Sequence, residues 1–196
     1  MTAHAVLDTA GLAVCSVYCT IPLFWLVVHP FARRWRQHGQ RAYRAIMPLW
    51  AVFIIAALAL GWRFPHVHLY HSRAAWVPGV LFMLMGLSIY RQAFQGFDRA
   101  RVSGLAELDP LRYDQQLVTN GIRAQARHPI YLGHFCEVFG WCLGTGSLAL
   151  IALLVFAVIS GAIMIRVEED ELEQRFGEAY RWYRRSVPPF LPRWSK

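Results

Sequence analysis

The sequence predicts an all-α integral membrane protein with about five transmembrane helices. Of its 196 residues, 56% are hydrophobic and only 16% are charged, which is too apolar for a soluble domain of this length. Its apolar runs also have the length that a bilayer core of about 30 Å requires of a spanning helix. We expect a single domain covering residues 1–196, with a cytoplasmic cofactor pocket and a C-terminal amphipathic helix.

The apolar runs define the expected spans in chain order. Residues 1–10 contain no Lys or Arg, so we expect the first span to be a retained helix and not a signal peptide. The fourth span is short and contains His134 and Glu137, whose polar side chains belong at a helix interface or in a water-filled cavity. The last two spans are joined only by Gly144-Thr145-Gly146-Ser147, which predicts a tight helical hairpin. The predicted spans are 10–29, 45–62, 74–90, 130–145 and 147–165.

The basic residues are distributed on one side of the predicted membrane. Of the 20 Lys and Arg residues, all except Arg63 and Arg73 follow the first, third or fifth span. The positive-inside rule then places the N-terminus outside and the C-terminus in the cytoplasm. Membrane topology therefore accounts for the net charge of +8, and we expect membrane lipids, and no nucleic acid, as partners.

The four cysteines indicate neither a metal site nor a disulfide. They lie inside apolar stretches, with no C-x-x-C pair and no histidine at zinc-finger spacing. We therefore expect no metal and interpret the thiols as small buried hydrophobic side chains. These residues are Cys15, Cys19, Cys136 and Cys142.

Two cytoplasmic segments are too long to be simple connections. Residues 91–129 contain glycines and an Asp-Pro pair between apolar residues, which predicts an ordered irregular segment. Residues 166–196 begin with an acidic run, Glu168 to Glu171, and continue with apolar residues at helical spacing from Leu172 to Tyr183. This spacing predicts the amphipathic helix, which Val187-Pro188-Pro189 ends.

The acidic run has two interpretations. Negative charge is favoured in the first turn of a helix, so the run can simply mark a helix start. Alternatively it forms a site with Arg127-His128-Pro129-Ile130-Tyr131, at the entrance to the fourth span. A helix start with free amides, an arginine, a histidine and a tyrosine would bind an anionic group such as a carboxylate. The pentapeptide alone is equally compatible with contacts to lipid headgroups.

Together these elements resemble the isoprenylcysteine carboxyl methyltransferase family, and phospholipid methyltransferases share much of the pattern. The resemblance covers residues 115–193, with the order and spacing of the motifs intact. The motifs are Leu117-Val118-Thr119-x-Gly121, Arg127-His128-Pro129-x-Tyr131-x-Gly133, the apolar hairpin, Glu168-Glu169-x-x-Leu172-x-x-x-Phe176-Gly177-x-x-Tyr180-x-x-Tyr183, Val187-Pro188 and Leu191-Pro192.

The resemblance implies a methyltransferase that uses S-adenosylmethionine, bound by residues 115–133 and 166–193. The implied acceptor is lipophilic and lies in the membrane, either an isoprenylcysteine-like carboxylate or a lipid amine. A carboxylate such as Glu168 would accept hydrogen bonds from the ribose or the ammonium group, whereas Arg127 and His128 suit the cofactor carboxylate. The cofactor-binding residues implied by position are Gln115, Gln116, Leu117, Val118, Arg127, His128, Pro129, Ile130, Tyr131, Glu168 and Glu169.

The chain departs from the family pattern at two positions. Arg123 stands where relatives commonly have an aromatic residue, so a stacking contact there is not expected. Met164 stands where many relatives have an arginine linked to the acceptor, and Arg166 is the nearest candidate for that role.

Methyl transfer from a sulfonium depends mainly on positioning and needs no metal. A carboxylate acceptor would need no general base, whereas an amine would have to lose a proton to His134 or Glu137. A role of both residues as interhelical polar contacts is the favoured interpretation. Two other functions remain open. One is an NADPH-dependent sterol or steroid reductase, whose terminal helices look similar but usually carry an Arg-Asp pair in place of Glu168-Glu169. The other is a non-catalytic membrane binding protein on the same scaffold.

Overall fold

The computed structural model describes residues 3–64, 67–95, 103–109, 112–113 and 116–190. Within these ranges the chain is helical and contains no β-strand; an isolated bridge pairs His68 with Ser147. The all-α prediction is confirmed. The elements are α1 (Ala3–Val28), α2 (Ala32–Arg36), the 3-10 helix η1 (Gly39–Ala42), α3 (Tyr43–Trp62), α4 (Trp76–Phe94), α6 (Leu105–Leu108), the 3-10 helix η2 (Gly121–Ala124), α7 (Pro129–Thr145), α8 (Leu148–Phe176) and α9 (Glu178–Ser186).

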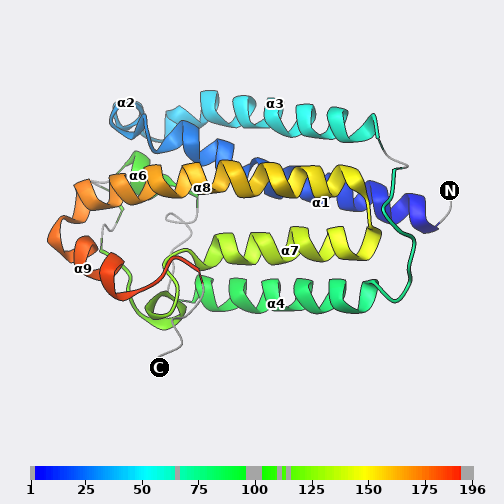
Figure 1. The fold of residues 1–196 in the computed structure, drawn as a ribbon. Helices are drawn as coiled ribbons and strands as arrows, with labels where there is room; N and C mark the ends of the chain where they lie inside the picture. The colour runs from blue at the N-terminus through cyan, green and yellow to red at the C-terminus, as the bar shows by residue number, and fades with distance from the viewer. Residues whose placement is uncertain (1–2, 65–66, 96–102, 110–111, 114–115, 191–196) are drawn as a thin grey trace.

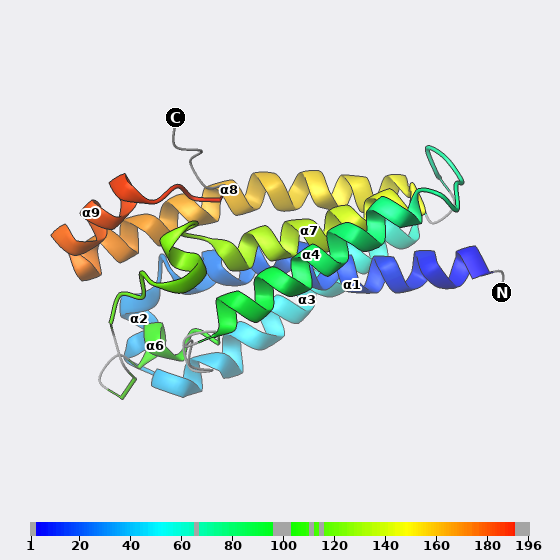
Figure 2. The same ribbon diagram turned by 90° about the horizontal axis from the view of Figure 1, so that it is seen from below.

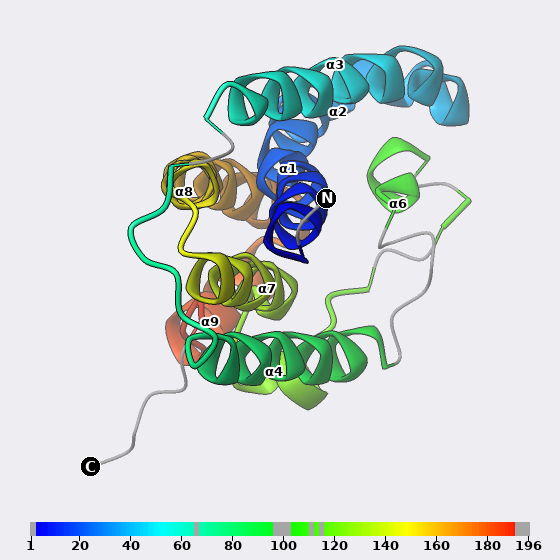
Figure 3. The same ribbon diagram turned by 90° about the vertical axis from the view of Figure 1, so that its right-hand side faces the viewer.

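The long helices α1, α3, α4, α7 and α8 lie along a common direction (Figure 1). The short elements α2, α6 and α9 gather at one end, and the N-terminus lies at the other, in both side views (Figures 1 and 2). Seen along the bundle, α1 lies between α3, α7 and α8, and α4 packs against the outer side of α7 (Figure 3). A buried cluster joins α1, α7 and α8, and it contains Cys15, Cys19 and Cys142. These thiols and Cys136 are free and buried, as the sequence predicts.

Four of the described helices are long and apolar enough to cross a membrane, namely α1, α3, α4 and α8. They correspond to the first, second, third and fifth predicted spans. The fourth predicted span forms α7, which has 17 residues and begins at Pro129, and its role as a fifth span remains a prediction. Since α7 packs against α4, α1 and α8, neighbouring helices cover much of its surface, and it does not need to be apolar on every side.

The last long helix extends well past the membrane segment predicted for it. The apolar part of α8 ends at Ile165, and the helix continues without a break through the acidic run to Phe176. The interpretation of the acidic run as a helix start is therefore wrong. The predicted single amphipathic helix is also corrected, because Gly177 adopts a positive φ of 57° and separates α8 from α9. Helix α9 does end directly before Val187-Pro188-Pro189, where proline cannot continue a helix.

The predicted hairpin between α7 and α8 is confirmed. Gly146 adopts a positive φ of 66°, which favours glycine, and the chain re-enters a helix at Leu148. The connection that follows α3 packs on this turn, because the Leu69 amide donates to the Gly146 carbonyl over 2.9 Å and the Leu148 amide donates to the Val67 carbonyl over 2.9 Å. The turn thereby closes the end of the bundle opposite α2, α6 and α9.

Candidate active site

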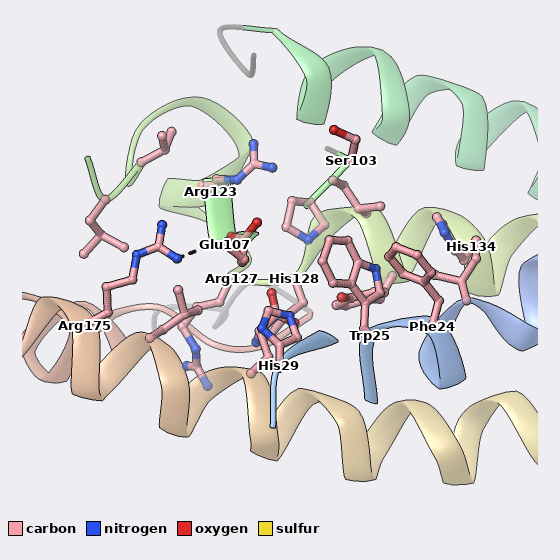
Figure 4. A pocket seen from close by; sticks show the side chains of 18 of the residues that line it. Phe24, Trp25, His29, Ser103, Glu107, Arg123, Arg127, His128, His134 and Arg175 are labelled. Atoms are coloured by element: carbon pink, nitrogen blue, oxygen red, sulfur yellow. Dashed lines mark hydrogen bonds and ion pairs between the residues drawn. The ribbon is translucent and has the colours of Figure 1, made fainter. Parts of the chain in front are cut away.

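A cavity of about 520 Å³ opens at the end of the bundle where α2, α6 and α9 gather. In Figure 4 the labelled charged side chains lie toward one end of the cavity, and Trp25 and Phe24 lie with His134 toward the other. The charged part contains His29, Glu107, Arg123, Arg127, His128, Glu168 and Arg175. The apolar part contains Tyr18, Ile21, Phe24, Trp25, Met47, Trp50 and Phe94. One cavity thus joins a polar pocket to apolar side chains of the membrane helices α1 and α3.

The structure brings most of the predicted cofactor-binding residues to this cavity. Three separate stretches of chain meet there: residues 116–118, residues 127–131 and Glu168. Pro129 begins α7, so its fixed φ and missing N–H suit the first helical position. Glu169 does not line the cavity but lies behind His128, and Gln115 lies outside the described residues.

The three weaker catalytic candidates lie in different surroundings. His134 lines the cavity, and one of its ring nitrogens is 2.6 Å from the Tyr90 hydroxyl. Glu137 is buried between α7 and α4, where its carboxyl lies against Gly86. Arg166 is exposed on α8 and does not line the cavity. Of the three, only His134 can reach a ligand in the cavity.

Glu169 is the centre of a buried ion-pair network. Arg127 donates to its carboxylate through Nε over 2.9 Å, a ring nitrogen of His128 lies 3.0 Å away, and Nε of Arg184 lies 3.1 Å away. Nη2 of Arg127 also donates to Glu169, and Nη1 donates to the carbonyl oxygens of Arg184 and Val187. Burial opposes ionisation of Glu169, but the hydrogen bonds from His128 and Arg127 outweigh it and lower its pKa to about 2. The network fastens α8 to α9 and to the start of α7.

The neighbouring glutamate has a different environment. Glu168 lines the cavity, and its Oε2 atom is buried without a hydrogen-bond partner among the described residues. Nδ1 of His128 lies 3.7 Å from this oxygen, beyond hydrogen-bond distance. A buried carboxylate oxygen without a partner is costly, so Glu168 is available to a ligand with hydroxyl or ammonium donors.

Arg123, which departs from the family pattern, serves as an anchor for the segment before α7. Its Nη1 donates to the Ala93 carbonyl over 2.8 Å, at the end of α4. Its own carbonyl accepts a hydrogen bond of 2.7 Å from the Tyr183 hydroxyl of α9. The residue thereby holds η2 between α4 and α9, beside the cavity.

Two titratable residues that the fold brings to the site were not among the predicted site residues. His29 follows α1, Glu107 belongs to α6, and both line the charged part of the cavity. Burial raises the pKa of Glu107, although His29 and Arg175 oppose the shift. Burial would lower the pKa of His29, but the nearby Glu171, Glu168 and Glu107 carboxylates raise it. Neither residue belongs to a recognisable motif, so no signal in the sequence marked them.

Comparison with known proteins gives a family match. The family model described as phospholipid methyltransferase matches residues 75–179. A protein-S-isoprenylcysteine O-methyltransferase of Schizosaccharomyces pombe is 38% identical over 84 residues, which are 40% of this chain and 34% of that protein. The nickel-cobalt-cadmium resistance protein NccN of Alcaligenes xylosoxydans xylosoxydans is 37% identical over 86 residues, 43% of this chain and 39% of that protein.

A third relative is methanethiol S-methyltransferase 2 of Bradyrhizobium diazoefficiens, which is 35% identical over 112 residues, 57% of this chain and 38% of that protein. The chain therefore matches between about a third and two fifths of the length of these relatives. No solved structure matches the chain.

Proposed function

Because the chain belongs to the phospholipid methyltransferase family, we propose that it is a methyltransferase that uses S-adenosylmethionine and acts on a lipophilic acceptor in the membrane. The observation that carries the proposal is the single cavity in which a charged pocket adjoins apolar side chains of α1 and α3. A polar donor and an apolar acceptor can meet only in a site with both characters. The names of the relatives point to different methyl acceptors. The proposal of a lipophilic acceptor therefore rests on the apolar part of this cavity.

The residues of the charged part fit S-adenosylmethionine. Glu168 offers an unpartnered carboxylate oxygen to ribose hydroxyls or an ammonium group. The stretch 116–118 and the residues from His128 to Tyr131 would enclose the nucleoside. We assign Arg127 and Glu169 a positioning role, because the Arg127 donors are engaged by Glu169 and by carbonyl oxygens. When bound, the cofactor supplies a methyl carbon on a sulfonium, whose leaving group is a neutral thioether.

The apolar part would hold the acceptor and keep water away from the reacting atoms. Trp25 and Trp50 come from α1 and α3, so an acceptor dissolved in the bilayer would reach the cavity between membrane helices. An acceptor that must lose a proton would find His134 as the base, whereas a carboxylate needs none. We propose an isoprenylcysteine-like carboxylate or a lipid amine as the acceptor. Since Arg166 lies outside the cavity, it would not bind the acceptor's carboxylate there.

We further propose that the charged end of the bundle faces the cytoplasm and the N-terminus lies outside. Among the described arginines, all except Arg63 and Arg73 lie in or next to the elements at the charged end. The positive-inside rule places such an end in the cytoplasm, where S-adenosylmethionine would also be available.

Titration calorimetry of the full chain purified in detergent tests the function. We expect micromolar binding of S-adenosylmethionine and of its demethylated product S-adenosylhomocysteine, and no binding of NADPH. Binding of NADPH alone would refute the methyltransferase and favour a reductase. Binding of S-adenosylmethionine without turnover of any isoprenylcysteine or aminophospholipid acceptor would favour a non-catalytic binding protein.

A further inference from the structure

Five charged or titratable side chains form a second network at the charged end of the cavity, apart from the one around Glu169. Nη2 of Arg36 lies 3.1 Å from Oε1 of Glu171, and Nε of Arg36 donates to the Glu107 carbonyl over 2.9 Å. Nη1 of Arg175 lies 3.4 Å from Oε1 of Glu107 and 3.7 Å from Oε1 of Glu171. His29 completes the network, which thus joins the end of α1, α2, α6 and α8.

This network has unused hydrogen-bonding atoms of both kinds. The His29 side chain is only 4% exposed, and its Nδ1 atom is 3.7 Å from Oε2 of Glu171, beyond hydrogen-bond distance. Oε2 of Glu107, Oε2 of Glu171 and Nε of Arg175 are likewise buried without a partner among the described residues. His29, Glu107 and Arg175 line the cavity and lie on the same part of its wall (Figure 4). Glu171 does not line the cavity. Buried polar atoms are normally paired, so the unpartnered atoms of the three lining residues beside one cavity indicate a ligand.

The charges in this network specify a zwitterion. A simple anion would face the carboxylates of Glu107 and Glu171, and a simple cation would face Arg36 and Arg175. A group with an ammonium and a carboxylate a few atoms apart satisfies both signs, because the ammonium can donate to Glu107 and the carboxylate can accept from Arg175 and His29, all of which line the cavity.

We propose that this network binds the amino-acid end of S-adenosylmethionine, and this inference rests on the proposed function. The Arg127-His128 helix entrance is the less suitable place for that end, because Glu169 already pairs with the Arg127 guanidinium and lies 3.0 Å from a ring nitrogen of His128. Residues 29 and 36 lie outside the matched family region, so the first half of this chain contributes to cofactor binding. A zwitterionic lipid headgroup shares the same chemistry, with a phosphate in place of the carboxylate.

The test compares two ligands that differ only at the amino-acid end. S-adenosylhomocysteine carries that end, and 5′-methylthioadenosine keeps the adenosine and the thioether but lacks it. We expect Glu107→Gln to weaken binding of S-adenosylhomocysteine by about tenfold or more and to leave binding of 5′-methylthioadenosine unchanged. His29→Asn should act in the same direction. Both affinities are measured by calorimetry on the full chain in detergent.

Glu178→Gln is the matched control, because the Glu178 side chain is 80% exposed on α9 and lies away from the cavity. It should change the affinity for neither ligand.

The outcomes separate the inference from the proposed function. If Glu107→Gln weakens binding of both ligands equally, or of neither, while the wild type binds S-adenosylhomocysteine, the inference is wrong and the proposed function stands. If Glu107→Gln instead abolishes binding of glycerophosphoethanolamine, the network is a lipid headgroup site. A wild type that binds no S-adenosylhomocysteine refutes both proposals.

Discussion

At the scale of single residues, two adjacent glutamates have different environments because successive positions on an α-helix point about 100° apart. Glu169 faces Arg127, His128 and Arg184 and is 5% exposed. Glu168 faces the cavity and keeps an unpartnered oxygen. We therefore expect Glu169 to contribute to stability and Glu168 to contribute to ligand binding.

Glu169→Gln should lower the free energy of unfolding by about 3 kcal/mol, because it leaves the buried Arg127 guanidinium without its counter-charge. Glu168→Gln should leave the unfolding free energy nearly unchanged and weaken binding of S-adenosylhomocysteine. Thermal unfolding and calorimetry in the same detergent check both variants. Equal loss of stability in the two variants would contradict this division of roles.

The Glu169 network should also make the stability of the protein depend on pH. Its pKa is lowered from 4.5 to about 2 in the folded protein, so the unfolded chain binds the proton more readily. The stabilisation that ionised Glu169 contributes is therefore complete above pH 4.5 and is lost as the pH falls toward 2. The difference in unfolding temperature between wild type and Glu169→Gln should shrink across that interval. A difference that stays constant on acidification would show that Glu169 does not titrate as described.

At the scale of elements, α4 and α7 pack closely because glycines face each other across the contact. A Cβ atom on Gly140 would lie 2.6 Å from the Gly79 carbonyl oxygen and 2.8 Å from Cγ of Met83. The close contact holds α7, and with it the residues from Arg127 to Tyr131 at its start, against the bundle. The site is thereby positioned by helix packing within the membrane region.

Gly140→Ala should destabilise the protein by about 1–3 kcal/mol, since the added methyl group overpacks a contact with backbone that cannot move aside. Gly161→Ala, also within a long helix, is the control. A Cβ atom there would meet only Cγ of Pro22, at 3.8 Å, which is ordinary contact. Alanine is the better helix former, so this variant should be neutral or slightly more stable. Unfolding temperatures measured in detergent distinguish the two variants. A similar drop in unfolding temperature in both would refute the packing argument.

At the scale of the whole molecule, the bundle has two chemically different ends. The cavity, the ion-pair networks and most described arginines lie at the end with α2, α6 and α9 (Figures 1 and 4). The opposite end holds the turn between α7 and α8 and the connection after α3. A fixed orientation in the membrane would therefore place the site in one compartment only.

Cysteine labelling tests that orientation. The four native cysteines are buried and should give little background. Ser72→Cys and Ser186→Cys are matched substitutions at exposed positions on opposite ends of the bundle. An impermeant maleimide should label Ser72→Cys in intact cells and Ser186→Cys only after the membrane is opened. The reverse pattern would invert the proposed topology.

The all-α class, four membrane-length helices, the α7–α8 hairpin and the stretches of chain that meet at the cavity could all be predicted from the sequence. Apolar run length and motif spacing are local properties, which is why the sequence was sufficient for them. Three features became visible only in the folded protein: α8 continues through the acidic run, Arg127 is engaged by Glu169, and His29 and Glu107 join the site. These features depend on how each helix is rotated and on contacts between distant parts of the chain, and neither leaves a periodic signal in the sequence.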